Sequence, residues 1–480
     1  MLIKSLVIIV YSLLIIVFGL IGLKRTRTFS DFFLGGGKVG PWMTAFTYGT
    51  AYFSAVLFIG FAGKIGWDFG YSGLWIAIGN TFIGVLLVWW LLGPRIKTMA
   101  DEYGVSTMAE YFEKRYDSRF LKLFSSICIF VFFIPYSAAV FIGLSYLFKT
   151  NFDINFSLAL IFMGFFTAIY LVLGGYKSMT MIDVIFGIIM IAGVIILVMN
   201  TVKSGGGLQS ITMRLEQINP SLVSWVGPPG LWPLISLVFL TSVAPMAMPQ
   251  LVQKFYAIRD RKAIRIGMIA STIFALLICG AAYFTGATTR VFLTVAETPD
   301  AFELGKPVVD NLMPILLAKV IPHSLSILIL LLILSASMST LAALVLISSS
   351  AAVKDVYQGF INPQATDLQL TLFMRVANAC FVLLSVILAY FRPATIVAIL
   401  GVSWGAIGSV FLGPFIWGLF MKKANKMGAI SSAILGLTVC LSLSIYGMSP
   451  PEAGTLGMIV SLCSNPIVSL VFQRTKPQTR

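Results

Sequence analysis

Apolar stretches long enough to cross a lipid bilayer recur along the whole chain, and short polar, glycine-rich or proline-containing segments separate them. A membrane-spanning helix needs about 20 consecutive, mainly apolar residues. The pattern therefore predicts an all-α polytopic membrane protein with about thirteen transmembrane helices. In the connection at 291–324, the stretch NLMPILLAKVI predicts a short interfacial helix. The expected spans cover residues 3–23, 41–65, 71–93, 120–148, 156–176, 180–203, 231–256, 263–290, 325–357, 368–391, 394–421, 427–447 and 453–473.

The composition and the distribution of charge agree with a location in the lipid bilayer. Of the 480 residues, 58% are hydrophobic and 11% are charged, whereas a soluble domain carries about 25% charged residues. The net charge of +15 comes from Lys and Arg between the apolar stretches rather than along one face, which argues against a nucleic-acid partner. Loops rich in Lys and Arg stay in the cytoplasm. This rule predicts a cell-membrane protein with its N-terminus outside and its C-terminus in the cytoplasm.

The residue types that catalysis needs are scarce. His323 is the only histidine, and the five cysteines form no CxxC pair, which disfavours zinc sites and Ser–His or Cys–His catalysis. We therefore do not expect an enzyme. All five cysteines lie in apolar stretches, so we expect them to be buried as small hydrophobic residues.

Two of the expected spans carry features that interrupt a helix. The span at 41–65 has Thr, Gly and Ser side chains near its centre, and the span at 231–256 contains Pro245 and Pro249. A helix interior does not easily accommodate two such prolines, and the backbone groups that a break releases need partners. Transporters place their binding sites at such breaks, near the bilayer midplane.

The two broken spans lie five spans apart, which divides a single transporter domain into units. We expect a first five-helix repeat at 41–203 and a second at 231–421, of inverted topology because each contains an odd number of spans. The span at 3–23 precedes this core, and two further spans at 427–473 follow it.

A run of hydroxyl residues interrupts the otherwise apolar span at 325–357. Ser339 and Thr340 are adjacent, and Ala336 lies one helical turn before Ser339. Their two hydroxyls and one carbonyl, with two carbonyls from the broken span at 41–65, would supply five neutral oxygens, which suit Na⁺. Ser and Thr also hold membrane helices together by hydrogen bonds, and the residues alone leave that alternative open.

Four separated passages carry a family resemblance: FFLGGGKVGPWMTAFTYGTAYFSAVLFIG, LVLGGYKSMTMIDVIFG, PQLVQKFYAIRD and ASMSTLAALVLISSSAAVKDVY. With them the chain resembles the sodium:solute symporter family. The resemblance implies a LeuT-type 5+5 inverted-repeat fold that works by alternating access. It also implies a sodium site formed by the carbonyls of Thr50, Phe53 and Ala336 and the hydroxyls of Ser339 and Thr340.

The resemblance also bears on the number of ions and on their exit. Some members of the family bind a second sodium ion through serine side chains where this chain has Ala342 and Ala343, so we expect one Na⁺ per cycle. Asp183 matches an acidic residue near the cytoplasmic ion exit of the family. A position at the membrane interface, close to Lys177, is the alternative for Asp183.

By the same resemblance, Ser54, Tyr52, Tyr136, Thr241 and Pro245 bind the solute. The proline carriers have an acidic residue where this chain has Tyr52 and a tryptophan where it has Thr241, which argues against proline. The passage YFSAVLFIG favours pantothenate or a monocarboxylate, and an amino acid stays open. No buried Arg or Lys is evident at this depth, so an anionic group would have to rest on backbone amides and helix N-termini.

Other functions remain to be distinguished. Asp183 makes a proton-coupled symporter of the same fold the first alternative. A passive channel would need a continuous polar lining, and a transporter-like sensor is a third possibility. We expect a monomeric functional unit whose partners are the lipid bilayer and a small-molecule solute.

Overall fold

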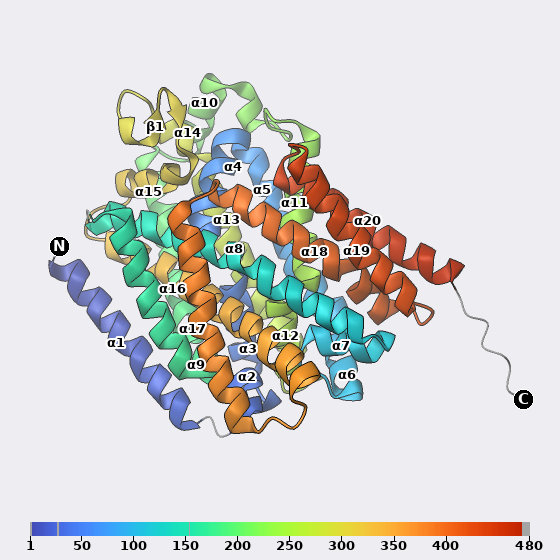
Figure 1. Ribbon diagram of the computed structural model, residues 1–480. Helices are drawn as coiled ribbons and strands as arrows, with labels where there is room; N and C mark the ends of the chain where they lie inside the picture. Colours follow the sequence, from blue (N-terminus) through green and yellow to red (C-terminus); the bar gives the residue numbers. More distant parts are fainter. Residues whose placement is uncertain (1, 26–27, 153, 473–480) are drawn as a thin grey trace, which may run out of the picture.

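The computed structural model describes residues 2–25, 28–152 and 154–472, which are almost entirely helical (Figure 1). The α-helices are α1 (Leu2–Arg25), α2 (Phe29–Leu34), α3 (Pro41–Tyr52), α4 (Ala62–Phe69), α5 (Leu74–Gly79), α6 (Gly93–Tyr103), α7 (Met108–Tyr116), α8 (Arg119–Phe152), α9 (Phe156–Ser204), α10 (Leu208–Ile218), α11 (Leu231–Val243), α12 (Pro249–Ala257), α13 (Arg261–Ala287), α14 (Thr289–Phe292), α15 (Val309–Val320), α16 (Ser326–Ser350), α17 (Asp367–Phe391), α18 (Ile396–Phe420), α19 (Lys426–Ile445) and α20 (Pro450–Val471).

Short 3-10 and π-helical segments link or extend these helices, and a two-stranded hairpin lies in the connection before α15. The 3-10 segments are η1 (Gly35–Gly37), η3 (Gly70–Gly73), η5 (Pro220–Val223), η6 (Ala244–Ala247) and η7 (Pro299–Ala301). The π-helical segments are η2 (Val56–Phe61), η4 (Asn80–Leu92) and η8 (Ala351–Ile361). The antiparallel strands are β1 (Phe302–Glu303) and β2 (Lys306–Pro307). The expected short helix around NLMPILLAKVI is confirmed as α15.

Among the described residues, ten helices are long and apolar enough to cross a membrane, or up to eleven if the bent pair α11 and α12 forms one span. All thirteen expected spans fall on helical segments. The count is lower because helix continues from Val56 to Tyr103 across two expected spans, and because the apolar part of the first half of α9, Phe156–Ile169, is short. The number of crossings stays a prediction.

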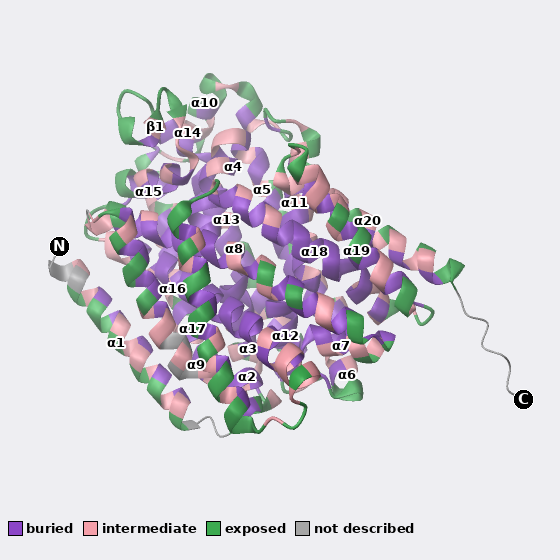
Figure 2. Cartoon of the chain, viewed as in Figure 1, coloured by how far each residue is buried: buried purple, intermediate pink, exposed green. Residues whose placement is uncertain are grey.

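The most enclosed helices lie in the centre of the bundle. In the most apolar windows of α18 and of α16 with η8, 89% and 83% of residues are buried, against 28% in α1 and 33% in α19. Figures 1 and 2 show α1 along one edge and α19 and α20 along the opposite edge, with the buried positions concentrated between them. The helices at the positions of the expected flanking spans therefore lie at opposite edges of the bundle.

Both expected breaks are confirmed. α3 ends at Tyr52, and Phe53 takes an extended conformation (φ −107°, ψ 107°) before helix resumes at η2. α11 and α12 meet at an angle of 41°, with Met248 extended between them. Pro249 opens α12, where the missing proline N–H costs nothing because the first amides of a helix lack intrahelical partners.

A third break divides α9 at Gly175, whose φ of 62° lies in the left-handed region. A Cβ at this position would lie 2.8 Å from a ring carbon of Phe32, so packing and backbone conformation both require glycine. The expected boundary between the spans at 156–176 and 180–203 falls at this turn.

The cysteine prediction is partly wrong. Cys128, Cys279 and Cys440 are buried, but Cys380 in α17 and Cys463 in α20 are exposed on the outside of the bundle. A helix face that contacts lipid is as apolar as one that contacts protein, so an apolar stretch does not distinguish the two.

The short helix α15 is attached to the start of α18 by a buried carboxylate. Asp310 accepts the backbone N–H of Ile396 at 3.2 Å and 3.4 Å through its two oxygens. Burial raises the pKa of Asp310 to about 6, although the hydrogen bond from Ile396 and the charge of Lys64 act in the opposite direction. The contact satisfies a helix-terminal amide that has no partner within α18.

Candidate ion and solute sites

The end of α3 and the middle of α16 meet at a cluster of buried oxygens. The hydroxyl of Thr340 lies 3.2 Å from the carbonyl oxygens of both Thr50 and Ala51 and 3.1 Å from that of Ala336. The Ser339 hydroxyl donates to the Thr50 hydroxyl at 2.8 Å. Thr50, Ser339 and Thr340 are all fully buried. Four of the five predicted ion ligands are therefore in one place.

The carbonyl of Ala51 is a further member of this cluster that sequence reasoning missed. The last four carbonyls of a helix have no intrahelical partner. At the end of α3, the Gly49 carbonyl accepts the amide of Phe53, which leaves the carbonyls of Thr50 and Ala51 to the Thr340 hydroxyl. This rule could have identified Ala51 once the end of the helix was known.

The fifth predicted ligand, Phe53, has a different setting. Its ring stacks on Tyr52 with centroids 4.4 Å apart and lines the adjoining cavity. In the described part of the chain, the carbonyls of α3 that accept from the Thr340 hydroxyl are those of Thr50 and Ala51. A role for the Phe53 carbonyl stays a prediction.

The amides on the other side of the break are already occupied. The Ala55 N–H donates to the Ser337 hydroxyl at 3.2 Å, and the Val56 N–H donates to the Ser54 hydroxyl at 3.2 Å. The Leu57 N–H donates to the Ser54 carbonyl at 3.0 Å. The expectation that an anionic group rests on helix-terminal amides is therefore wrong for this half-helix, because side-chain and backbone oxygens of the protein already accept from these amides.

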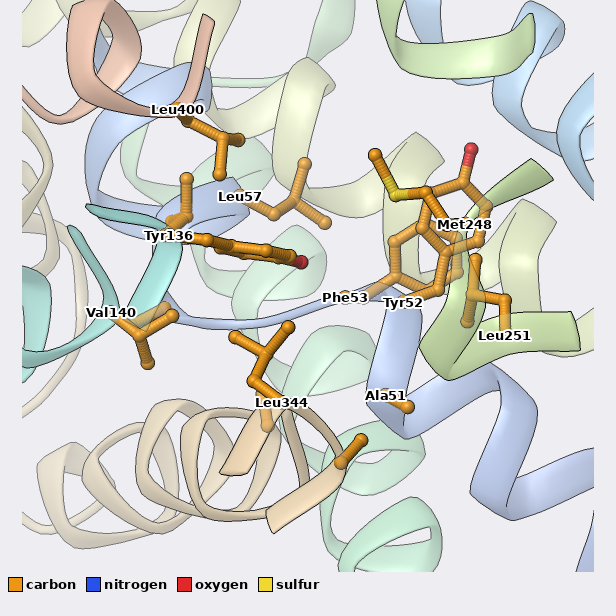
Figure 3. Close-up of a cluster of buried hydrophobic side chains, with 14 of the residues drawn as sticks. Ala51, Tyr52, Phe53, Leu57, Tyr136, Val140, Met248, Leu251, Leu344 and Leu400 are labelled. Carbon is orange, nitrogen blue, oxygen red and sulfur yellow. The ribbon is translucent and has the colours of Figure 1, made fainter. Parts of the chain in front are cut away.

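Beside the break lies a small, partly open cavity of about 30 Å³. Tyr52, Ser54, Tyr136 and Thr241, four of the five predicted solute residues, line it. In Figure 3 the ring of Tyr136 extends from α8 towards the break, below Leu57. The remaining lining residues are all uncharged: Phe53, Val56, Leu57, Phe61, Asn80, Tyr283, Leu400 and Trp404.

The fifth predicted solute residue, Pro245, lies in η6 and is not among the lining residues. Its carbonyl accepts the amide of Met248 at 3.4 Å, so it contributes to the bend between α11 and α12.

The two broken spans are joined by a hydrogen bond beside the cavity, where the Tyr52 hydroxyl donates to the Thr241 carbonyl at 2.5 Å. Sequence reasoning missed Asn80 and Trp404, because an aromatic or amide residue in an apolar stretch carries no signal for which neighbour it faces.

Asp183 is fully buried in α9, and whether it lies at the depth of the membrane interface stays a prediction. The carboxylate lies beside the hydroxyls of Ser339 and Thr47 and faces the ammonium of Lys254 in α12. Lys254 is also fully buried, with its nitrogen 4.9 Å from the ring centroid of Tyr176. By the geometry of the described residues, neither charged group completes a hydrogen bond. A buried lysine therefore exists, but it adjoins the ion cluster rather than the solute cavity.

Within the described residues, no group of three or more His, Cys, Asp and Glu side chains could hold a metal ion. The ion cluster instead offers carbonyl and hydroxyl oxygens at a helix break. Unwound backbone carbonyls near the midplane are the groups with which transporters of this architecture coordinate sodium. The arrangement fits a monovalent cation that is carried as a coupling ion.

A model of the sodium:solute symporter family matches residues 32–436. This match covers most of the chain, which therefore belongs to the sodium:solute symporter family. It is a multi-pass membrane protein of a family of transporters, it couples solute transport to sodium, and Na⁺ is its coupling ion.

Curated relatives match along nearly the same length. The osmoregulated proline transporter OpuE of Bacillus subtilis is 27% identical over 483 residues, which cover 97% of this chain and 94% of the transporter. The sodium/pantothenate symporter of Haemophilus influenzae is 28% identical over 435 residues, which cover 88% of this chain and 87% of the symporter.

The fold also matches solved structures. A Na⁺-coupled sialic acid symporter in a substrate-bound, outward-open state has a TM-score of 0.83 at 19% identity, over 99% of this chain and 98% of the other. Mhp1, a nucleobase-cation-symport-1 family transporter in a closed conformation, has a TM-score of 0.55 at 13% identity, over 92% of this chain and 94% of the Mhp1 chain. These likenesses confirm the expected LeuT-type fold.

Proposed function

We propose that this symporter imports a small organic acid or an amino acid together with one Na⁺ bound between α3 and α16. The ligands of the ion would be the carbonyls of Thr50, Ala51 and Ala336 and the hydroxyls of Ser339 and Thr340. The Phe53 carbonyl stays a further candidate. Movement of the ion and the solute would follow by alternating access.

One observation gives the main support for the ion site. The Thr340 hydroxyl contacts three carbonyl oxygens from two helices, within 3.2 Å and out of contact with solvent. Converging carbonyls repel one another unless a positive group lies between them, and in the structure the hydroxyl proton fills that role. A sodium ion could take its place, because the hydroxyl oxygen is itself a ligand once its proton turns away.

A single ion per cycle is supported by the next turn of α16. Ala342 and Ala343 are buried there and bring no side-chain oxygen to a second site. Asp183, beside Ser339, is the candidate for the first group on the ion's exit path to the cytoplasm. Its burial next to the ion cluster also favours proton coupling as the second candidate, and the experiment below separates the two.

One sodium ion is sufficient for accumulation. Its passage across about 100 mV releases about 2.3 kcal/mol, and a tenfold inward gradient adds about 1.4 kcal/mol. The total of about 3.7 kcal/mol supports accumulation of a neutral solute by several hundredfold.

The solute class is supported by the cavity and by the relatives. Aromatic rings and aliphatic side chains dominate the lining, and its polar residues are uncharged. The two relatives described above are named as a proline transporter and a sodium/pantothenate symporter, and proline and pantothenate both carry a carboxylate. Tyr52 and Thr241, at places where proline carriers differ, favour pantothenate or a monocarboxylate over proline.

The breaks at Phe53 and Met248 support two inverted repeats at 41–203 and 231–421, with the flanking span at 3–23 and the two at 427–473 outside them. The distribution of Lys and Arg supports an external N-terminus and a cytoplasmic C-terminus. We propose a monomer as the functional unit, since the repeats of one chain form both candidate sites.

The test is thermal unfolding of the detergent-purified protein in NaCl and in equal choline chloride. A ligand that binds the folded state raises its stability by mass action. We expect a sodium-specific rise in the unfolding temperature that the double variant Ser339→Ala/Thr340→Ala loses. Ser349→Ala is the matched control, because Ser349 lies on the same helix, fully buried and without a hydrogen-bond partner among the described residues.

A wild-type protein that does not respond to sodium would contradict this site. A dependence on pH that Asp183→Asn abolishes would then assign the coupling to protons. A sodium response that survives in the double variant would place the ion elsewhere.

A further inference from the structure

The solute cavity contains a hydrogen-bond donor that the protein does not use. The indole Nε1 of Trp404, in α18, has no partner among the described residues, although Trp404 is only 5% exposed and lines the cavity. A buried donor without an acceptor costs about 1–3 kcal/mol of stability. Such groups in native structures call for an explanation, and an acceptor on a bound ligand is one.

Packing rather than hydrogen bonding holds the Trp404 ring in place. Its centroid lies 5.7 Å from that of Tyr136 in an edge-to-face arrangement and 6.1 Å from that of Tyr52. The Tyr52 ring is itself anchored through its hydroxyl at the Thr241 carbonyl. Trp404 Nε1 lies beside the Tyr136 hydroxyl without completing a hydrogen bond to it. The indole N–H is therefore held next to the cavity, beside the Tyr136 hydroxyl.

The backbone amides at the break and the side chain of Asn80 are already engaged by the protein. The first amides after the break in the span of α3 and α4 donate to Ser337 and Ser54, as described above. Asn80 accepts from Ser242 at 3.0 Å, and its amide nitrogen lies 3.9 Å from the sulfur of Cys279. No lining residue carries a charge that could neutralise an anionic solute. Recognition of an acceptor oxygen must therefore use neutral side-chain donors.

We propose that Trp404 donates its indole N–H to a carboxylate oxygen of the solute and thereby selects small carboxylates. This assignment rests on the proposed symport of an organic acid or amino acid, and it makes Trp404 a specificity-determining residue. The Tyr136 hydroxyl beside it is placed to bind the same carboxylate. The surrounding Leu57 and Leu400 side chains would contact the apolar part of the solute.

The test is sodium-driven uptake of radiolabelled L-proline, pantothenate and lactate into proteoliposomes, for the wild type, Trp404→Phe and Trp89→Phe. Trp89→Phe is a matched control, because the Trp89 indole nitrogen is also buried without a partner but packs between Tyr48 and Phe255, outside the cavity. We expect Trp404→Phe to raise KM for the transported acid about tenfold or more, with a smaller change in kcat. Trp89→Phe should leave KM unchanged.

A second measurement does not depend on the folding of a variant. Prolinol and panthenol carry an alcohol in place of the carboxylate of proline and pantothenate. We expect each alcohol to compete with uptake of the transported acid at least tenfold more weakly than the matching acid does. Competition by the alcohols at the same concentrations as the acids, or equal KM values for the two phenylalanine variants, would overturn the assignment.

The outcomes separate this inference from the function on which it rests. A wild type that is stabilised by sodium and takes up one of the acids, with no effect of Trp404→Phe, overturns only the role of Trp404. A wild type that sodium stabilises but that transports none of the three acids overturns the carboxylate class. A wild type that responds to sodium in neither assay contradicts the proposed ion site as well.

Discussion

The ion cluster and the solute cavity adjoin the same break in the span of α3 and α4, but the protein builds them in opposite ways. The ion cluster is an arrangement of oxygens in which each hydroxyl already donates: Ser339 to Thr50, and Thr340 to carbonyls of both helices. The cavity is lined by rings and aliphatic groups and contains an indole N–H that has no acceptor in the described structure.

The difference follows from the direction of the chain at the break. A helix that ends exposes carbonyl oxygens, and a helix that begins exposes amide hydrogens. At the end of α3 the carbonyls of Thr50 and Ala51 are shared with α16, whereas the amides of Ala55 and Val56 are bound by Ser337 and Ser54. The carbonyl side of the break is thus shared with α16, whereas the protein itself occupies these amides on the other side.

The largest effect should come from the ion cluster. Thr340→Val keeps the shape of the side chain but removes one oxygen ligand, and a lost interaction with a charge costs about 1.5–3 kcal/mol. We expect the sodium concentration for half-maximal uptake to rise about tenfold to a hundredfold. Thr340→Ser keeps the hydroxyl and should stay close to the wild type. Equal sodium activation of the two variants would contradict the role of the hydroxyl.

The next prediction concerns the framework that both sites share. Ser337→Ala leaves the buried Ala55 amide without its acceptor, which should lower the free energy of unfolding by about 1–3 kcal/mol. Ser335→Ala is the comparison, because among the described residues the Ser335 hydroxyl accepts a long bond of 3.4 Å from Tyr11, whose loss should matter little. Denaturation in detergent measures both variants. If Ser337→Ala is as stable as Ser335→Ala, the amide is satisfied in some other way.

A third prediction uses Asp310, which lies outside both sites. The folded-state pKa of Asp310, about 6, exceeds the usual value of 3.8. Between pH 3.8 and pH 6, the folded protein therefore retains a proton that the unfolded chain has lost. Its contribution to stability therefore falls as the pH rises from about 4 to about 6, by about 3 kcal/mol.

Asp310→Asn keeps an acceptor for the Ile396 amide and has no proton to lose. We expect the stability of this variant relative to the wild type to increase from pH 4.5 to pH 7.5 in thermal unfolding. The effect of sodium on the unfolding temperature should be the same in both proteins. A constant difference in stability across this pH range would show that the carboxylate is solvated.

The smallest effect should come from the hydroxyl that joins the two broken spans. Tyr52→Phe removes the hydrogen bond to the Thr241 carbonyl, worth about 1 kcal/mol, and should raise KM for the solute about fivefold. Sodium activation should not change. Tyr48→Phe, on the same helix and outside the cavity, removes a comparable bond to the Gly84 carbonyl and serves as the control for uptake. A shift in sodium affinity in Tyr52→Phe would mean that the two sites are not separable at Tyr52.

Several features of the sites could be predicted from the sequence because their causes are local. Pro245 and Pro249 disrupt a helix wherever that helix packs, and the adjacent hydroxyls of Ser339 and Thr340 need partners in an apolar span. Other residues gave no local signal. Trp404 and Asn80 lie in apolar stretches like many core residues, and their place beside the cavity depends on which helix faces them.

The placement of Asp183 likewise could not be predicted from its neighbours in the sequence. Its nearness to Lys177 in the sequence allowed a position at the interface, and only the turn at Gly175 and the packing of Lys254 place it inside the protein. Two cysteines were misjudged for a related reason, since lipid-facing and protein-facing sides of a helix have the same composition.

By itself, the sequence determined a multi-pass helical membrane protein and the positions of two broken spans. It also indicated most of the residues whose oxygens form the ion cluster. These follow from hydrophobicity, from backbone chemistry and from motifs, all of which act over a few neighbouring residues. Only the tertiary structure decided that the Ala51 carbonyl joins the cluster and that the Ser337 hydroxyl accepts the Ala55 amide at the break. It also decided that the indole N–H of Trp404 lies beside the cavity. Those outcomes depend on distances between helices far apart in the chain, which packing alone sets.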